Sequence, residues 1–298
     1  MATINIAPPQ PVVMADLKGK VDPDWCPGCG DYGVLAAVQK ALVELQIPNH
    51  MVATVSGIGC SSNFPGFINT YGMHTLHGRS LPVASGLKLA NPEMTVLVTG
   101  GDGDGFGIGV GHFVHAMRRN INLTYMVLDN QIYGLTTGQT SPTSRIGMKT
   151  KSNPQGNQDT PVNPLTLALS AGATFVGRGF SGDQKHLTEL IKQAIQHKGF
   201  SFLDVFSPCV TYNKDNTYQW FNPRVKILEE QDHDPTENVY IYQIVKNSGE
   251  IGRDMLQTYT GVSKYWDRGA SELKTFPFGK LKGKWTGMTK ADLAKLSS

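Results

Sequence analysis

Short, mostly apolar runs that end at glycine- or serine-containing turns restrict the fold of this chain more than any other feature. The segments between them have helical periodicity, so strands and helices alternate along the sequence. Strands that are apolar on both sides need cover on both faces, as in a parallel sheet with helices packed on each side. The sequence therefore predicts an α/β fold with a parallel sheet flanked by helices, in which residues 51–55, 94–98, 123–128 and 200–206 are strands.

Three segments place apolar residues three and four positions apart, which puts them on one face of a helix. The last segment follows Asp183, whose carboxylate can cap a helix start, and ends shortly before Gly199, a residue type common after helix ends. The expected apolar faces are Leu35, Val38, Leu42 and Leu45 in the first helix, Val110, Phe113, Val114 and Met117 in the second, and Leu187, Leu190, Ile191 and Ile195 in the third.

Glycine-rich segments follow Val55, Val98 and Leu128, the last residues of three predicted strands. The carboxyl ends of parallel strands meet at one edge of a sheet, and ligands of such sheets bind at that edge. We therefore expect the three glycine-rich segments to lie close together and to form a ligand site.

The charge balance and the hydropathy exclude several classes of function. Lys and Arg number 27 and Asp and Glu 24, a formal net charge of +3, which argues against binding to nucleic acid or to an anionic membrane surface. No apolar run approaches the roughly 18–20 residues of a transmembrane helix, and the first residues lack the features of a signal peptide. We therefore expect a cytoplasmic protein, a location that favours metal binding over disulfides for its four cysteines.

The glycine-rich segment at residues 100–107 carries two carboxylates, Asp102 and Asp104. It does not have the glycine spacing of the dinucleotide-binding motif, and the carboxylates would repel a bare diphosphate. A hard cation between carboxylate and phosphate removes this conflict, and Mg²⁺ prefers such oxygen ligands. Asn130, just after the next predicted strand, supplies a second oxygen.

The pattern Gly-Asp-Gly, followed one helix and one strand later by Asn, resembles the fingerprint of thiamine-diphosphate enzymes. The resemblance implies the diphosphate-binding domain of that fold. It also implies that a magnesium ion is held by Asp102, Asn130 and the backbone carbonyl of Ile132.

The four cysteines, Cys26, Cys29, Cys60 and Cys209, all fall in predicted loops, whereas inert buried cysteines usually lie inside helices or strands. A metal site is therefore expected, and the spacing leaves zinc and an iron–sulfur cluster both open. Cys60 lies in a strand-end loop that should border the diphosphate site. A redox cluster has a function at that place and a structural zinc ion does not, so position favours the cluster.

Together these motifs resemble the β subunits of the 2-oxoacid:ferredoxin oxidoreductases over residues 20–210. The resemblance implies that the four cysteines bind a 4Fe–4S cluster next to thiamine diphosphate. It also implies a set of cofactor contacts, namely Ile58, Gly59, Cys60, Ser61, His77, Gly103, Asp104, Gly134 and Leu135.

In this family a 2-oxoacid is oxidatively decarboxylated with coenzyme A to an acyl-CoA and CO₂, and single electrons pass through the cluster to ferredoxin, in a reaction that can run in reverse. The family resemblance also implies a partner α subunit, which carries the pyrimidine-binding domain and the activating glutamate, in an (αβ)₂ assembly. We expect an N-terminal arm at residues 1–24, the diphosphate-binding domain at 25–210 and a C-terminal extension at 211–298 that packs on the domain or on the partner.

The identity of the 2-oxoacid is less constrained by the sequence. Asn63 stands where some relatives that accept several 2-oxoacids carry lysine, so their substrate contacts do not transfer directly. Residues 133–143 resemble the versions that handle 2-oxoglutarate, whose second carboxylate needs a cation such as Arg79 or an arginine of the partner. We favour 2-oxoglutarate over pyruvate. An NAD-dependent Rossmann oxidoreductase and a zinc-stabilised non-catalytic subunit are the remaining alternatives.

Overall fold

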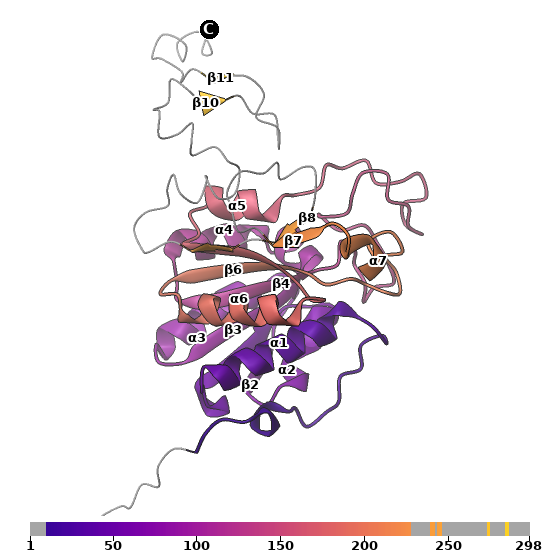
Figure 1. The fold of residues 1–298 in the computed structure, drawn as a ribbon. Helices are drawn as coiled ribbons and strands as arrows, with labels where there is room; N and C mark the ends of the chain where they lie inside the picture. Colours follow the sequence, from indigo (N-terminus) through magenta and orange to yellow (C-terminus); the bar gives the residue numbers. More distant parts are fainter. Residues whose placement is uncertain (1–9, 228–238, 242, 246–272, 275–283, 286–298) are drawn as a thin grey trace, which may run out of the picture.

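The structure is a computed structural model that describes residues 10–227, 239–241, 243–245, 273–274 and 284–285. A seven-stranded sheet forms its centre, and helices cover both faces of the sheet (Figure 1). None of the helices in the described part of the chain has the length and apolarity that crossing a membrane requires.

The strand order across the sheet is β2-β1-β3-β4-β6-β5-β9. Neighbouring strands from β2 to β5 are parallel, and β9 pairs antiparallel with β5. The predicted parallel sheet is therefore confirmed, with the four expected strands present as β1, β3, β4 and β6. The strands are β1 Val52–Ser56, β2 Tyr71–His74, β3 Thr95–Gly101, β4 Leu123–Asp129, β5 Phe175–Phe180, β6 Phe200–Phe206 and β9 Gln243–Val245.

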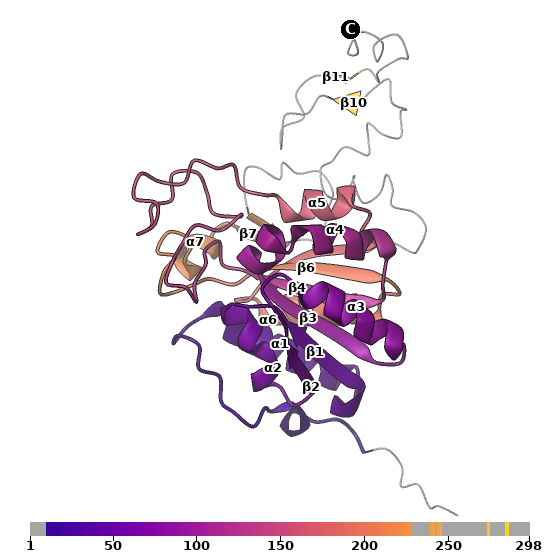
Figure 2. The ribbon, with the colours of Figure 1, turned by 180° about the vertical axis from the view of Figure 1, so that it is seen from behind.

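The helices form one layer on each face of the sheet (Figure 2). The first layer contains α1 Gly30–Glu44, α2 Phe64–Phe67 and α6 Gln184–Gln196, and the second contains α3 Ser80–Ala90, α4 Val110–Arg119 and α5 Pro164–Ser170. Short helical turns η1 Met14–Leu17, η2 Asn49–Met51, η3 Cys60–Asn63 and η4 Gly103–Ile108 connect these elements. The three predicted helices are present as α1, α4 and α6.

Two details of the predicted helices differ from expectation. Asp183 does cap α6, because its Oδ1 accepts a hydrogen bond from the backbone N of His186 at 3.0 Å. Val110, however, is 37% exposed at the start of α4, so it does not belong to the buried face that Phe113 and Met117 form. Leu45 lies just past the end of α1 and is only half-buried.

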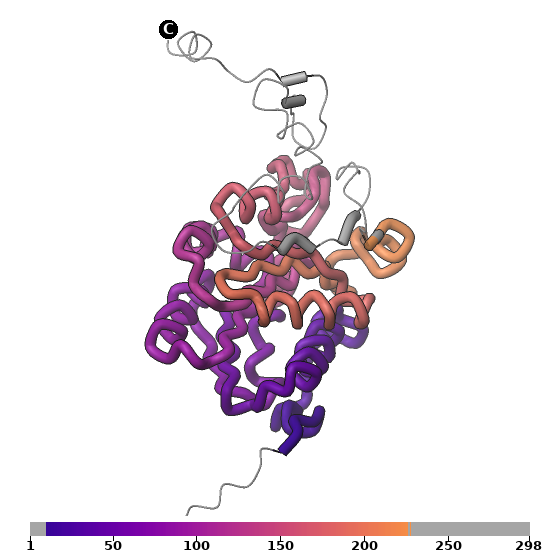
Figure 3. The backbone as a smooth tube through the Cα atoms, turned by 60° about the vertical axis from the view of Figure 1, so that its left-hand side comes forward, coloured from indigo at the N-terminus to yellow at the C-terminus, as the bar shows by residue number. Residues whose placement is uncertain are grey.

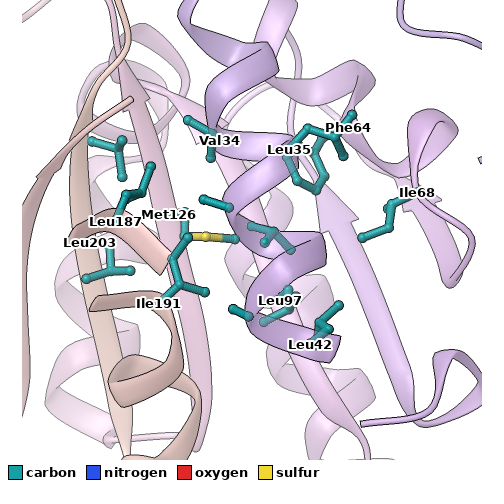
Figure 4. Close-up of a cluster of buried hydrophobic side chains, with 14 of the residues drawn as sticks. Val34, Leu35, Leu42, Phe64, Ile68, Leu97, Met126, Leu187, Ile191 and Leu203 are labelled. Carbon is teal, nitrogen blue, oxygen red and sulfur yellow. The ribbon is translucent and has the colours of Figure 1, made fainter. Parts of the chain in front are cut away.

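The apolar core between the sheet and the first helical layer shows why these elements pack (Figure 4). Leu42 of α1 and Ile191 of α6 are fully buried against the sheet, where they meet Leu97 of β3, Met126 of β4 and other strand side chains. Burying each such side chain contributes roughly 1.5–3 kcal/mol. This packing fixes α1, and with it the loop that precedes α1, against the sheet.

The carboxyl ends of β1, β3, β4 and β6 lie at one edge of the sheet, since these four strands are neighbours and parallel. The register pairs Gly101 with Leu128 and Asp129 with Phe206, so these strands end level with one another. The prediction that the glycine-rich segments meet at one edge is confirmed, and we call this edge the carboxyl edge.

The chain beyond residue 210 also contacts the sheet. Phe221 is buried, with its ring centroid 5.5 Å from that of Phe180 and 5.0 Å from that of Phe206. The tube view shows this segment beside the strands (Figure 3). The remaining elements of this part are α7 Tyr218–Phe221, β7 Val225–Ile227, β8 Val239–Ile241, β10 Leu273–Lys274 and β11 Lys284–Trp285. Most of the predicted C-terminal extension lies outside the described residues.

Candidate functional site

Asp102 lies just past β3 at the carboxyl edge and is fully buried. Its Oδ2 accepts hydrogen bonds from the hydroxyl groups of Ser141 and Thr143, the latter at 2.6 Å. Oγ1 of Thr143 also lies 2.9 Å from Oδ1 of Asp129, the last residue of β4. Burial raises the pKa of Asp102 to about 6, although the two hydroxyl groups oppose this shift. Burial and the neighbouring Asp102 also raise the pKa of Asp129, so the pair favours a nearby cation.

The loop after β4 is held by its backbone from two sides. Ser144 donates a hydrogen bond from Oγ to the carbonyl of Gln131 at 2.6 Å, and Asn213 donates from Nδ2 to the carbonyl of Asn130 at 2.9 Å. Oδ1 of Asn130 accepts from the backbone N of Ile132 at 3.1 Å, an arrangement that closes the turn. This loop and Asp102 therefore stand side by side at the ends of adjacent strands, as predicted.

Asp104 joins three loops of the carboxyl edge through one oxygen atom. Its Oδ1 accepts hydrogen bonds from the backbone N of Ile58 at 2.9 Å and of Gly78 at 2.7 Å, and lies 3.0 Å from Nδ1 of His77. The side chain of Asp104 is only 1% exposed, whereas that of His77 is 38% exposed. Burial raises the pKa of the Asp104 carboxyl, while the backbone donors lower it. The carboxylate thus positions the loops that follow β1 and β2.

The loop after β1 has an open surface and an unsatisfied hydroxyl group. Gly59 adopts φ +135°, which favours glycine, and a Cβ atom added there would meet no atom within 4 Å. Within the described residues, the buried hydroxyl of Ser61 has no hydrogen-bond partner. Such a group is a candidate for contact with a bound ligand, because an unpaired buried hydroxyl costs free energy.

Gly103 stands at the start of η4, where a side chain has no room. A Cβ atom added there would overlap the ring of Tyr133, whose hydroxyl group donates to the carbonyl of Gly103 at 3.1 Å. The glycine therefore allows the loop after β4 to pack directly on the loop after β3.

The structure brings the four predicted cysteines together although they come from distant parts of the chain. Cys60 and Cys209 lie close enough to Cys29 to raise the pKa of its thiol, and Cys26 and Cys209 do the same for Cys60. All four are free thiols. Two backbone hydrogen bonds close this arrangement, since Gly30 donates to the carbonyl of Pro208 at 3.1 Å and Cys29 donates to that of Cys26 at 2.9 Å.

Burial and negative charge oppose ionisation of the inner thiols. Burial raises the pKa of Cys60 to about 12, and the charge of Asp31 adds to the shift. The pKa of Cys29 is also raised, for the same two reasons in the same order. Asp31 itself is 1% exposed, accepts a hydrogen bond from Ser207 Oγ at 2.5 Å, and has its pKa raised to about 6 by burial.

Gly134 lies where the cysteines meet the loop after β4. A Cβ atom added at this residue would stand 3.5 Å from Cys60 Sγ, 3.8 Å from Cys209 Sγ and 3.8 Å from Asn130 Nδ2. The thiols and the predicted magnesium loop are therefore in contact with the same residue.

Apolar side chains are exposed around this edge. Ile58 is 44% exposed and Leu135 is 52% exposed, and both were expected to contact the cofactor. Ile108, at the end of η4, is 56% exposed. Among the described residues, no group of three or more His, Cys, Asp or Glu side chains is arranged to hold one metal ion.

Sequence reasoning missed the residues that support the predicted ligands. The hydroxyl groups that bind Asp102 come from Ser141 and Thr143, which are 39 and 41 positions away in the sequence. The hydroxyl group that binds the carbonyl of Gln131 comes from Ser144, 13 positions away. No local pattern indicates these contacts. The dense run Ser-Pro-Thr-Ser is the only signal that the sequence offers. Asn213 gives no signal at all, since it acts through a contact across 83 positions.

Comparison with known proteins is consistent across sequence and structure. Residues 56–205 match the family "Thiamine pyrophosphate enzyme, C-terminal TPP binding domain", and residues 209–261 match the family of the C-terminal region of the pyruvate ferredoxin oxidoreductase beta subunit. The chain is 49% identical over 258 residues to the 2-oxoacid:ferredoxin oxidoreductase subunit beta of Saccharolobus solfataricus, a match that covers 86% of this chain and 82% of the relative.

Two further relatives are named for 2-oxoglutarate. The 2-oxoglutarate oxidoreductase subunit KorB of Mycobacterium tuberculosis is 47% identical over 204 residues, which cover 68% of this chain and 55% of the relative. Among solved structures, a 2-oxoglutarate:ferredoxin oxidoreductase from Magnetococcus marinus with 2-oxoglutarate, coenzyme A and succinyl-CoA bound superposes with a TM-score of 0.76, at 38% identity and 96% coverage of both chains.

These matches set aside the NAD-dependent and the non-catalytic alternatives. They agree with the observed parallel sheet flanked by helices. The chain belongs to the β subunits of the 2-oxoacid:ferredoxin oxidoreductases and contains their thiamine-diphosphate-binding domain.

Proposed function

We propose that this β subunit holds magnesium–thiamine diphosphate and a 4Fe–4S cluster side by side at the carboxyl edge. They serve the oxidative decarboxylation of 2-oxoglutarate with coenzyme A to succinyl-CoA and CO₂, with electrons passing to ferredoxin. The observation that carries this proposal is the place of Gly134, which borders two cysteine thiols and the side chain of Asn130 at once. A redox centre in contact with the magnesium loop is the arrangement that electron removal from a bound thiamine cofactor needs.

The oxygen donors fit magnesium. Asp102, the side chain of Asn130 and the carbonyl of Ile132 offer one carboxylate, one amide and one peptide oxygen, and Mg²⁺ completes its octahedron with phosphate oxygens and water. Burial raises the pKa of Asp102 to about 6, and a bound cation would favour its ionised form. The proposed magnesium site takes only one carboxylate from the protein. It is therefore compatible with the finding that, among the described residues, no three His, Cys, Asp or Glu side chains are arranged around one metal ion.

The four thiols fit a cluster better than a zinc ion. A 4Fe–4S cluster takes each thiolate on a different iron atom, whereas zinc gathers all four ligands around one point. The four thiols gather at the carboxyl edge beside Asn130, where a redox cluster has a function and a structural zinc ion has none. We assign Cys26, Cys29, Cys60 and Cys209 as the cluster ligands.

The chain's own residues bind and orient the cofactor in this proposal. Bound thiamine diphosphate supplies a nucleophilic carbon that attacks the 2-oxoacid and holds the electrons left by decarboxylation. Gly59 offers an open backbone to the cofactor, and Ser61 offers a free hydroxyl group. We also assign Gly103 and Asp104 as cofactor contacts. Nδ1 of His77 lies 3.0 Å from Oδ1 of Asp104, and the His77 side chain is 38% exposed, so we assign it as a further contact of the cofactor.

Exposed side chains of Ile58, Ile108 and Leu135 around the site support a partner that covers it. We assign this role to an α subunit with the pyrimidine-binding domain and the activating glutamate, in an (αβ)₂ assembly. Within the chain we retain an arm at residues 1–24, the cofactor domain at 25–210 and an extension at 211–298. Produced alone, the chain is expected to bind thiamine diphosphate weakly and to show no turnover, which an activity assay on rigorously isolated chain checks.

The choice of 2-oxoglutarate is supported by the likeness to the Magnetococcus marinus enzyme, which was solved with that acid bound. Arg79 stands near the site and donates from Nη1 to the carbonyls of Gly78 and Ile108, each at 3.3 Å. We assign Arg79 as a candidate partner for the second carboxylate of the substrate. Measurement of kcat/KM for 2-oxoglutarate and pyruvate, with the native partner and ferredoxin, tests the choice, and a preference for pyruvate would reverse it.

Iron, magnesium and thiamine content of the anaerobically purified complex tests the cofactor assignment. Four irons and one thiamine diphosphate for each β chain are expected for a 4Fe–4S cluster beside one cofactor. Zinc in place of iron would refute the assignment.

A further inference from the structure

We propose that Asn213 couples the two cofactor sites, so that the occupancy of the magnesium site and the redox state of the cluster influence each other. This inference rests on the proposed function, because it takes Asn130 as a magnesium ligand and Cys209 as a cluster ligand. It adds a positioning residue that neither the sequence motifs nor the family comparison indicates.

The amide nitrogen of Asn213 reaches the magnesium loop. Its Nδ2 donates to the backbone carbonyl of Asn130 at 2.9 Å. Asn130 is the residue whose side chain faces the proposed magnesium ion, so this hydrogen bond fixes the peptide that carries the ligand. The Asn213 side chain is fully buried, which makes the contact strong and costly to lose.

The amide oxygen of the same side chain closes the bend that directly follows the turn from Cys209 to Tyr212. Oδ1 of Asn213 accepts hydrogen bonds from the backbone N of Asp215 at 3.2 Å and of Asn216 at 3.0 Å. In the turn just before this bend, the backbone N of Tyr212, the residue next to Asn213, donates to Cys209 Sγ at 3.4 Å. A hydrogen bond to a ligand sulfur affects the reduction potential of an iron–sulfur cluster.

One buried side chain therefore links the peptide of Asn130 to the turn that donates to the Cys209 sulfur. A shift of Asn130 on metal binding moves Asn213, and a shift of Asn213 changes the hydrogen bond at the cluster ligand. Thermodynamic linkage makes such an effect reciprocal, since the cluster's redox state must alter cofactor affinity by the same factor.

The experiment measures this factor on the assembled αβ complex. The midpoint potential of the cluster is determined by redox titration, followed by electron paramagnetic resonance, with and without magnesium and thiamine diphosphate. Calorimetry then gives the affinity for magnesium–thiamine diphosphate with the cluster oxidised and reduced. We expect a potential shift in the wild-type complex that matches the affinity ratio, where a tenfold ratio corresponds to 59 mV for a one-electron couple.

Two variants separate the ends of the link. Asn213→Asp keeps the oxygen that accepts from Asp215 and Asn216. It removes the donor to Asn130, together with the longer contact of 3.5 Å to Oδ1 of Asn216, so the potential shift should disappear while four irons are retained. Asn213→Ala removes both interactions, and it should also change the electron paramagnetic resonance signal of the cluster in the cofactor-free state.

Ser144→Ala is the control on the magnesium side. It removes the hydrogen bond to the adjacent carbonyl of Gln131 and the acceptor for the backbone N of Ser141, and within the described residues the hydrogen bonds of the Ser144 hydroxyl group do not include the Cys209 turn. It should weaken magnesium binding and leave the coupling factor unchanged. Coupling absent from the wild-type complex, or fully retained in Asn213→Asp, would overturn the inference. A wild-type complex without iron or without thiamine diphosphate would instead refute the proposed function, so the two failures are distinguishable.

Discussion

The magnesium region and the cysteine region meet at Gly134, but the chain builds them in different ways. Asp102 and Asn130 follow adjacent strands, and the hydroxyl groups of Ser141 and Thr143 hold the carboxylate in place. The cysteines come from loops before α1, after β1 and after β6. There burial and the neighbouring Asp31 raise the thiol pKa values of Cys29 and Cys60.

The difference shows which free energy organises each site. Protein hydrogen bonds hold the carboxylate of Asp102 in place in the magnesium region. Thiolates must form in the cysteine region against burial and against negative charge, so binding of iron must provide the free energy for their deprotonation. We therefore expect losses in the cysteine region to be all-or-none and losses in the magnesium region to be graded.

The largest expected effect is at Cys209, and it tests the all-or-none half of this comparison. Cys209→Ser should lose the cluster and end ferredoxin reduction. With three thiolate ligands, the iron–sulfur bonds no longer offset the cost of ionising the buried thiols. Iron analysis and visible absorption of the anaerobic complex measure the loss. Thr211→Ala, an exposed position in the same turn, serves as control and should keep its iron. Four irons and full electron transfer in Cys209→Ser would remove Cys209 from the ligand set.

The next effect is at Asp102, and it tests whether the two regions are built independently. Asp102→Ala should keep the colour of the cluster but weaken magnesium-dependent thiamine diphosphate binding by more than about 100-fold, since loss of a supporting group alone costs roughly 10–100-fold. Calorimetry on the assembled complex measures the affinity. Unchanged affinity would falsify the magnesium assignment, and loss of the cluster would contradict the independence of the regions.

A graded effect is expected at Thr143, whose hydroxyl group lies between Asp102 and Asp129. Thr143→Val should lower magnesium affinity by roughly 10–100-fold. The lost hydrogen bond had lowered the pKa of Asp102, so the pKa, about 6 with the hydroxyl group present, should rise further. Magnesium needs the ionised carboxylate. As the pH is lowered, the affinity for magnesium should therefore begin to fall at a higher pH in the variant than in the wild type. Calorimetry between pH 5 and 8 checks this, and identical pH profiles would show that the hydroxyl group has no such role.

The smallest effect is expected at Asp183, whose side chain caps α6 by accepting from the backbone N of His186. Asp183→Ala removes the hydrogen bond to the start of α6 and should lower the free energy of unfolding by about 1 kcal/mol. Iron content and magnesium affinity should not change, as denaturant titration and calorimetry can verify. A change in either would mean that the regions depend on general stability, which would weaken the comparison.

The fold was predictable where burial dominates the sequence pattern. Strands β1, β3, β4 and β6 are central and apolar, so their runs stand out. Strand β2 is an edge strand with all four residues exposed, and it lacks such a run. Strand β5 contains Gly177 and Gly179, and these glycines interrupt the apolar pattern by which a strand is recognised in the sequence. The structure explains these glycines, since an added Cβ would approach Leu190 and Leu203 at Gly177 to about 3.0 and 2.9 Å, and Leu187 at Gly179 to 2.7 Å.

The site was predictable where ligands follow strands and not where side chains act across long separations. Asp102 and Asn130 end adjacent parallel strands, and topology alone brings them together. Asp31 and Asn213 find their partners 176 and 83 positions away. Such contacts depend on how α1 and the turn after Cys209 pack, which a sequence pattern does not encode.

The two borders of the seven-stranded sheet differ in a way that affects handling of the protein. On one side β9 closes β5, while on the other β2 has no further strand beside it among the described residues, and its Tyr71 and Met73 are 62% and 44% exposed. An uncovered strand with apolar side chains is a template for pairing with other chains. We expect the chain to aggregate through β2 when it is produced in excess over its partner, and co-production with the partner to keep it in solution.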